Sequence, residues 1–181
     1  AAVKILVVDD EPPIRKLLRV GLGEEGYAVI EAGNAKAAAE QVGREAPDLI
    51  LLDLGLPDLP GQDLLVRWRG EGLETPVVIL TMCDSHDDLA NAMRAGVRGY
   101  LLKDMDPDDV VDSIKRAVKG ELVVAPAMAT KLTHLLGAQT GREEGRALTE
   151  RELEILGYIA QGLSNKGIAK AEPKIRANAL T

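Results

Sequence analysis

Five short apolar runs, each separated from the next by a helical pattern, constrain the fold of this chain more than any other feature. The apolar runs predict strands at Val3–Val8, Tyr27–Glu31, Leu49–Leu52, Val77–Leu80 and Gly99–Leu102. The intervening segments carry apolar residues at helical spacing and predict helices at Pro13–Leu22, Ala35–Arg44, Gln62–Trp68, Asp87–Ala95 and Asp108–Val118. Strands that alternate with helices of this length form a parallel sheet with helices on both faces. The sequence therefore predicts an α/β fold with a five-stranded, doubly wound parallel sheet over residues 1–120.

A linker and a second domain are expected after the alternating region. Glycines and mixed polar residues characterise 121–146, which we interpret as a linker with a short helix at Ala127–Leu136. A new helical pattern then begins with a capping box, in which Thr149 is the N-cap and Glu152 lies three residues on. We expect residues 147–181 to form a small all-α domain.

Composition excludes several classes of protein. No apolar run approaches the roughly 20 residues that a membrane span needs, and the N-terminus carries no signal-peptide pattern, so we expect a cytoplasmic protein without membrane contact. A single cysteine, Cys83, excludes an internal disulfide. His86 and His134 have no Cys, His or carboxylate at a metal-like spacing and are expected on the surface. The net charge of −7 is uneven, because residues 1–120 are acidic and 162–181 are basic, which indicates different partners for the two ends.

Carboxylates follow two of the predicted strands at their carboxyl ends. Asp9 and Asp10 follow the first strand, and Asp53 follows the third. In an open parallel sheet, ligands bind at this edge, near the point where the strand order reverses. Three neighbouring carboxylates repel one another, so a hard divalent cation is needed to neutralise them. The sequence predicts a site for Mg²⁺ (or Mn²⁺), with these three side chains and the backbone carbonyl of Gly55 as ligands.

Two further polar residues end other predicted strands. Lys103 and Thr81 supply a cation and a hydroxyl, which suit the oxygens of a transferring phosphoryl group. Asp53 would then be the nucleophile that forms an acyl phosphate. Any one of the acids alone is as often a solvated turn or cap residue. Five such residues at four strand ends favour a joint site.

The segments ILVVDDE, LILLDLGLPDLPG, VVILT and GYLLK also match a known family in type, order and spacing. Together they resemble the receiver domain of bacterial two-component response regulators over residues 3–120. The resemblance implies a flavodoxin-like or CheY-like sheet, a sensor histidine kinase as phosphoryl donor, and Mg²⁺ as cofactor. It further implies that the chain is not an enzyme beyond self-catalysed phosphotransfer to Asp53 and slow autodephosphorylation.

The same resemblance implies a switch pair, Thr81 and Tyr100. On phosphorylation the Thr81 hydroxyl would move toward the phosphate and Tyr100 would rotate into the vacated space, which alters the face formed by residues 84–103. Without the resemblance, Tyr100 would be an ordinary half-buried strand aromatic. Met82 stands where the family usually has a small residue, and we expect it to narrow access to the acyl phosphate.

Particular residues argue against two alternative functions and leave a third one open. Gly21 to Gly26 (GLGEEG) match the dinucleotide-binding pattern, but they end a predicted helix and carry two acids that would repel phosphate, so helix C-terminal glycines explain them better. A phosphohydrolase would need an acid/base carboxylate two positions after Asp53, where Gly55 stands. The remaining alternative is a phosphorelay or interaction receiver without a DNA-reading output.

The string LTERELEIL, followed by IAQGLSNKGIA, closely resembles the start of the LuxR-type helix-turn-helix of NarL/FixJ-class response regulators. This resemblance implies control of transcription through promoter DNA, with homodimerisation on phosphorylation as a possible accompaniment. Four basic residues would contact DNA phosphates or base edges: Lys166, Lys170, Lys174 and Arg176. For Lys166 alone, a solvated helix face is an equally good interpretation. Too few residues follow Ala169 for the family's turn, recognition helix and final helix, so we expect residues 147–181 to form a partial DNA-binding domain.

Overall fold

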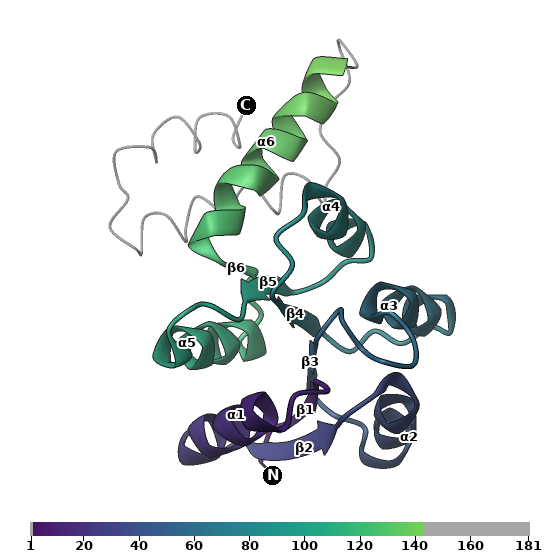
Figure 1. Cartoon of the computed structure of the whole chain (residues 1–181), viewed down its shortest axis with the longest axis vertical. Coiled ribbons are helices and arrows are strands. Elements are labelled where there is room, and N and C mark those ends of the chain that lie inside the picture. The colour runs from purple at the N-terminus through teal and green to yellow at the C-terminus, as the bar shows by residue number, and fades with distance from the viewer. Residues whose placement is uncertain (1, 143–181) are drawn as a thin grey trace.

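The structure, a computed structural model, describes residues 2–142. Strands and helices alternate along this part of the chain (Figure 1). The strands are β1 (Lys4–Val8), β2 (Ala28–Ala32), β3 (Leu49–Leu52), β4 (Val77–Thr81), β5 (Gly99–Leu102) and β6 (Val123–Val124). The helices are α1 (Pro12–Glu24), α2 (Ala35–Glu45), α3 (Gly61–Gly70), α4 (His86–Arg94), α5 (Pro107–Val118) and α6 (Pro126–Arg142).

All neighbouring strands pair in parallel, in the order β2-β1-β3-β4-β5-β6. Helices α1 and α5 cover one face of the sheet, and α2, α3 and α4 cover the other (Figure 1). Alternate residues of one strand enter the two opposite cores, as Ile50 and Leu51 do. This double burial explains the nearly continuous apolar runs, and it confirms the predicted doubly wound α/β fold.

The sheet has six strands in place of the predicted five, because a two-residue strand pairs at its edge. Val123–Val124 lies beside Gly99 and Tyr100 of β5. Gly99 permits this approach, since a Cβ there would lie 2.5 Å from Val123 Cγ2 and 2.6 Å from the Val123 carbonyl oxygen. The pattern of two valines was too short to predict a strand, so the segment was interpreted as linker.

The ends of several elements differ from the predicted ones by a few residues, as is common at frayed or capped termini. The second strand is Ala28–Ala32, one residue later than expected, and α3 begins earlier and ends later than the apolar pattern indicates. The glycine pattern lies in the last turns of α1 and just beyond it, where Gly26 has a φ of 90° and donates its N–H to the Gly23 carbonyl at 3.0 Å. Its interpretation as a helix end agrees with the structure.

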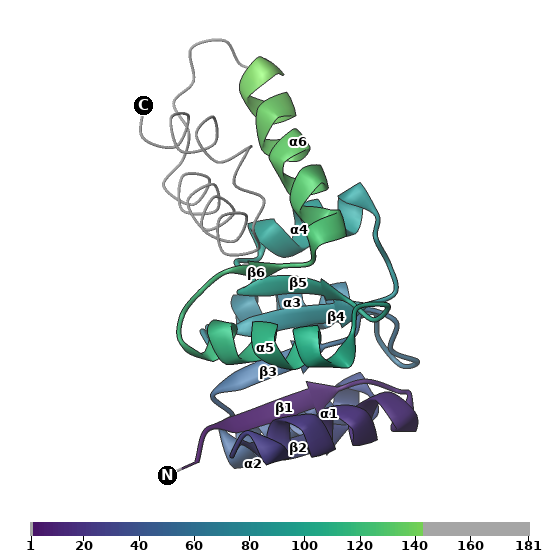
Figure 2. The same ribbon diagram turned by 90° about the vertical axis from the view of Figure 1, so that its left-hand side faces the viewer.

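The first half of α6 packs against the α/β body, close to α4 (Figure 2). Met128 and Leu132 are buried in the same apolar core as Tyr100. The Lys131 ammonium donates to the Asp84 carbonyl oxygen at 2.6 Å and lies 3.3 Å from the Asp84 carboxylate. The sheet and its core thus continue beyond residue 120 into the segment interpreted as a linker, and the helix predicted at 127–136 is longer at both ends.

His86 and His134 are both exposed, as expected, but their rings meet edge to face with centroids 6.5 Å apart, between α4 and α6.

Within residues 2–142, none of the helices has both the length and the apolar character that crossing a bilayer requires.

The loop between β3 and α3 is tied to α2 by one carboxylate. Asp58 accepts hydrogen bonds from the backbone N–H groups of Ala35 (2.8 Å) and Lys36 (3.0 Å), beside the N-cap residue Asn34. These N–H groups favour the charged carboxylate and lower the pKa of Asp58. The contact fixes the loop that leaves the sheet directly after Asp53.

We expect Gly99→Ala to displace β6 and destabilise the protein by about 1–3 kcal/mol, because the added methyl group meets Val123 side chain and backbone. Denaturant unfolding, followed by the fluorescence of Trp68, the only tryptophan, measures this loss. Gly43→Ala is the matched control, since a Cβ there meets nothing within 4 Å. Equal unfolding midpoints for wild type and Gly99→Ala would contradict the role of Gly99.

Asp58→Asn should lower stability at neutral pH and lose this effect in acid. The folded pKa of Asp58 lies below its unfolded value of about 3.9, so the stabilising contribution is complete above that pH and is lost as the pH falls through the folded pKa. Unfolding midpoints at pH 7 and near pH 3 test this, with the exposed Glu40→Gln on α2 as control. A difference of the same size at both pH values would show that the charge of Asp58 is not involved.

Candidate functional site

The site lies where β1 and β3 end side by side at the centre of the sheet. Val8 pairs with Leu52, and the Asp53 N–H continues the ladder to the Val8 carbonyl at 2.9 Å. The chain crosses from β1 to β2 on one side and then to β3 on the other, so the strand order reverses at this point. The register therefore brings Asp9 and Asp53 together, as the sequence predicted.

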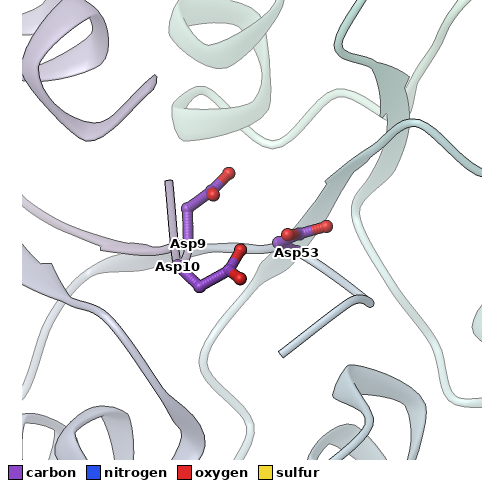
Figure 3. A group of neighbouring side chains, drawn as sticks. All are labelled: Asp9, Asp10 and Asp53. Carbon is purple, nitrogen blue, oxygen red and sulfur yellow. The ribbon is translucent and has the colours of Figure 1, made fainter. Parts of the chain in front are cut away.

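Asp9, Asp10 and Asp53 form one cluster at these strand ends (Figure 3). One carboxylate oxygen from each residue lies within 4.8 Å of the other two, and within the described residues this is the one such group of three or more possible metal ligands. Asp9 and Asp53 are 2% and 5% exposed, whereas Asp10 is open to solvent. Two fixed oxygens and one accessible oxygen fit a hard cation that keeps some of its water.

Gly55 lies beside this cluster. Its N–H donates to Asp53 Oδ1 at 3.3 Å, and a Cβ at this position would stand 3.9 Å from Asp53 Oδ2. The contact shows that the backbone after Asp53 curls back toward the Asp53 carboxylate. The predicted role of the Gly55 carbonyl as a metal ligand stays a prediction.

Lys103 connects the carboxylates from the end of β5. Its side chain is 5% exposed, and its ammonium lies 2.9 Å from Asp9 Oδ2, 3.1 Å from Asp53 Oδ2 and 2.9 Å from Glu11 Oε2. Burial by itself lowers the pKa of Lys103, but hydrogen bonds to these three carboxylates outweigh burial and raise the pKa above its usual value. Lys103 is therefore a fixed positive charge at neutral pH.

The carboxylates of this pocket nevertheless outnumber its one ammonium among the described residues. Burial raises the pKa of Asp9, the Lys103 ammonium and the Glu11 N–H lower it, and the charge of Asp53 raises it again, so that the net direction is upward. Four carboxylates, including those of Asp10 and Glu11, face one ammonium. A divalent cation would supply the missing charge, and the residues present fit Mg²⁺.

Thr81 and Tyr100 meet at the backbone of one residue, Cys83. The Thr81 hydroxyl, buried at the end of β4, accepts the Cys83 N–H at 3.2 Å. Tyr100 is fully buried, and its hydroxyl donates to the Cys83 carbonyl at 2.8 Å; burial raises the pKa of Tyr100. The Cys83 thiol in turn lies 2.6 Å from Asp88 Oδ2 of α4. The predicted pair is thus linked through the β4–α4 loop, and no sequence pattern indicates this linkage.

Three supporting residues were not predicted. Glu11 contacts Lys103, and its position directly after Asp9 and Asp10 was the available signal. Arg15 of α1 donates to the Asp9 carbonyl at 2.5 Å and so holds the end of β1. Gly61 opens α3 so close to the site that a Cβ would collide with the Asp53 carbonyl oxygen and lie 2.7 Å from Leu54 Cα. This need for glycine arises because the start of α3 packs against the backbone of Asp53 and Leu54 in the folded chain. The sequence around Gly61 does not indicate that contact.

Further sequence-based expectations also remain predictions. Met82 is 68% exposed beside Thr81, and its narrowing of access to an acyl phosphate stays a prediction. The predicted DNA-contacting residues, Lys166, Lys170, Lys174 and Arg176, and the predicted domain at 147–181, lie outside the described residues.

Comparison with known proteins agrees with both sequence resemblances. Residues 5–115 match the response regulator receiver domain, and residues 146–171 match the bacterial regulatory proteins of the luxR family. The chain is 36% identical over 170 residues to the nitrate/nitrite response regulator protein NarL of Escherichia coli K12, covering 92% of this chain and 79% of NarL. It is 37% identical over 172 residues to NarP of the same organism, covering 92% and 78% of the two chains.

Solved structures give the same result for the fold. A two-component response regulator of the LuxR family from Aurantimonas sp. SI85-9A1 matches with a TM-score of 0.69 and 28% identity, over 75% of this chain and 98% of that chain. The receiver domain of a putative Luxo repressor protein from Vibrio parahaemolyticus matches with a TM-score of 0.62 and 28% identity, over 66% and 92%. With its receiver fold and LuxR-type segment, the chain belongs to the NarL/FixJ class of response regulators, which are phosphorylation-controlled regulators of transcription.

Proposed function

We propose that Asp53 accepts a phosphoryl group from a sensor histidine kinase and that the acyl phosphate controls promoter binding by residues 147–181. The observation that carries this proposal is the Asp53 carboxylate itself, which is buried, held by Lys103 and flanked by Asp9 and Asp10 at the point where the strand order reverses. Residues 1–120 would serve as the receiver and 121–146 as its connection to the DNA-binding domain.

In the transfer step, a carboxylate oxygen of Asp53 attacks the phosphorus of a phosphohistidine. The new O–P bond forms as the P–N bond breaks, and the imidazole leaves with the electron pair and takes a proton from water. Lys103 and the Thr81 hydroxyl then meet the phosphoryl oxygens. Asp9, Asp10, Asp53 and the Gly55 carbonyl would hold Mg²⁺ (or Mn²⁺), which neutralises charge on the transferred group when it is bound.

The acyl phosphate should be lost slowly and without a dedicated catalyst. Gly55 stands two positions after the nucleophile and offers no carboxylate to activate water. Met82 would further narrow the approach of water. The protein then acts as a timed switch with slow autodephosphorylation.

The route from the site to the output runs through the β4–α4 loop. When Thr81 turns toward the phosphoryl group it would release the Cys83 N–H, and Tyr100 holds the carbonyl of the same residue. Asp84, the next residue, is bound by Lys131 of α6. The DNA-binding output would use Lys166, Lys170, Lys174 and Arg176, with a homodimer formed on phosphorylation; the luxR-family match favours this output over a relay without DNA reading.

Treatment with acetyl phosphate and Mg²⁺ should add one phosphoryl group to the wild type and none to Asp53→Asn, measured by intact mass. The amide lacks the nucleophilic oxygen charge that attack on phosphorus requires. Asp112→Asn, an exposed carboxylate on α5, is the control and should be phosphorylated like the wild type. A chelator should abolish the gain. Equal phosphorylation of Asp53→Asn would mean that another residue is the acceptor.

Tyr100→Phe should leave Asp53 able to take up phosphate but weaken the structural response. The ring still fills its buried site, while the bond from its hydroxyl to the Cys83 carbonyl, typically worth about 1 kcal/mol, is lost. Hydrogen exchange of residues 82–94, before and after phosphorylation, measures the response. If the variant shows the same change in protection as the wild type, Tyr100 has no part in the switch.

A further inference from the structure

The ammonium of Lys103 has no N–H left for a new partner. A lysine ammonium carries three donors, and here three carboxylates lie within 3.1 Å of the nitrogen. If a phosphoryl group arrives on Asp53, as proposed above, at least one of these carboxylates must withdraw from Lys103. The structure distinguishes the three by how firmly each is held.

Asp9 and Asp53 cannot easily withdraw. Both are buried at strand ends, Asp9 Oδ1 also accepts the Glu11 N–H at 2.9 Å, and the Asp53 backbone continues the β1–β3 ladder. A buried carboxylate that leaves its ammonium has no bulk water to solvate it. Their contacts with Lys103 are therefore the costly ones to break.

Glu11 can withdraw. Its side chain is 55% exposed, so water solvates the carboxylate as soon as it leaves Lys103. Glu11 is the N-cap residue of α1, yet its side chain makes no capping hydrogen bond. The helix would lose nothing if this side chain moved. Glu11 also lies outside the group of three possible metal ligands.

We propose that the Glu11 carboxylate is a placeholder for the phosphoryl group on Lys103. It occupies the third N–H of the ammonium while Asp53 is free, and a phosphoryl oxygen takes this N–H when Asp53 is modified. Glu11 thereby orients Lys103 in the resting state and competes with the incoming group. It is a positioning residue, because it acts through Lys103.

The competition predicts faster phosphorylation when the Glu11 contact is removed. With acetyl phosphate as donor, the bond from an Asp53 oxygen to phosphorus forms, the bond from phosphorus to the acetate oxygen breaks, and acetate leaves with the electron pair. Glu11→Gln should raise the rate of this step about threefold, the scale expected for a half-exposed ion pair. Affinity for beryllofluoride, a non-covalent phosphoryl analogue, should rise by a similar factor.

Glu11→Asp separates the contact from the charge. Aspartate keeps the negative charge and is a good N-cap, but it is one methylene shorter, so we expect its contact with Lys103 to lengthen or break. If the contact matters, Glu11→Asp should also phosphorylate faster than the wild type. Glu25→Gln, at the far end of α1, where the side chain pairs with Lys115 at 3.1 Å, removes one charge away from the pocket and should change nothing.

The full-length proteins are compared by intact mass over time and by beryllofluoride titration in Mg²⁺, followed by Trp68 fluorescence. Acceleration by Glu11→Gln with a wild-type rate for Glu11→Asp would mean that net charge acts and would overturn the placeholder role. Unchanged or slower rates in both Glu11 variants would overturn it as well. If the wild type itself gains no phosphate on Asp53, the proposed function fails, and this inference fails with it.

Discussion

The ammonium of Lys103 is the interaction on which the centre of this molecule depends. It joins the end of β5 to carboxylates that follow β1 and β3, which lie far from Lys103 in the sequence. Without it, Asp9 and Asp53 would be two buried, mutually repelling charges, and loss of one partner from a buried ion pair typically costs about 3–5 kcal/mol. Even with it, the carboxylates of Asp9, Asp10 and Asp53 lie close together around one ammonium, and burial raises the pKa of Asp9. The site is therefore held in a state that favours an additional cation.

The sequence predicted the parts of this site that depend on topology alone. Once β1 and β3 are recognised as parallel neighbours, Asp9 and Asp53 must lie at the same edge, because the register of parallel strands brings their carboxyl ends together. The sequence did not predict the contacts that depend on reach. The Glu11 side chain could bind Lys103 or cap its own helix. Which of the two it does depends on where the Lys103 ammonium lies in the folded chain.

The same distinction explains the missed strand. A continuous apolar run such as Leu49–Leu52 predicts a strand from its own residues. Strand β6, in contrast, forms because a glycine in another strand leaves room for Val123. The strand pairing thus depends on two residues far apart in the sequence, Gly99 and Val123, and no local sequence pattern indicates that they are neighbours. The extent of α6 was missed for a related reason, since burial of Met128 against the receiver core stabilises a helix that has weak amphipathic spacing of its own.

The β4–α4 loop connects the end of β4, beside the carboxylate cluster, to α6 through hydrogen bonds. Its residue Cys83 is bonded to the Thr81 hydroxyl and to the Tyr100 hydroxyl, and the following Asp84 is bonded to α6, which leads toward residues 143–181. Thr81 and α6 are therefore both hydrogen-bonded to the same short loop, through Cys83 and Asp84. In such an arrangement the signal needs no large rearrangement of the sheet. On the proposed function, we expect release of the Cys83 N–H by the Thr81 hydroxyl to alter how firmly Asp84 of the loop holds Lys131.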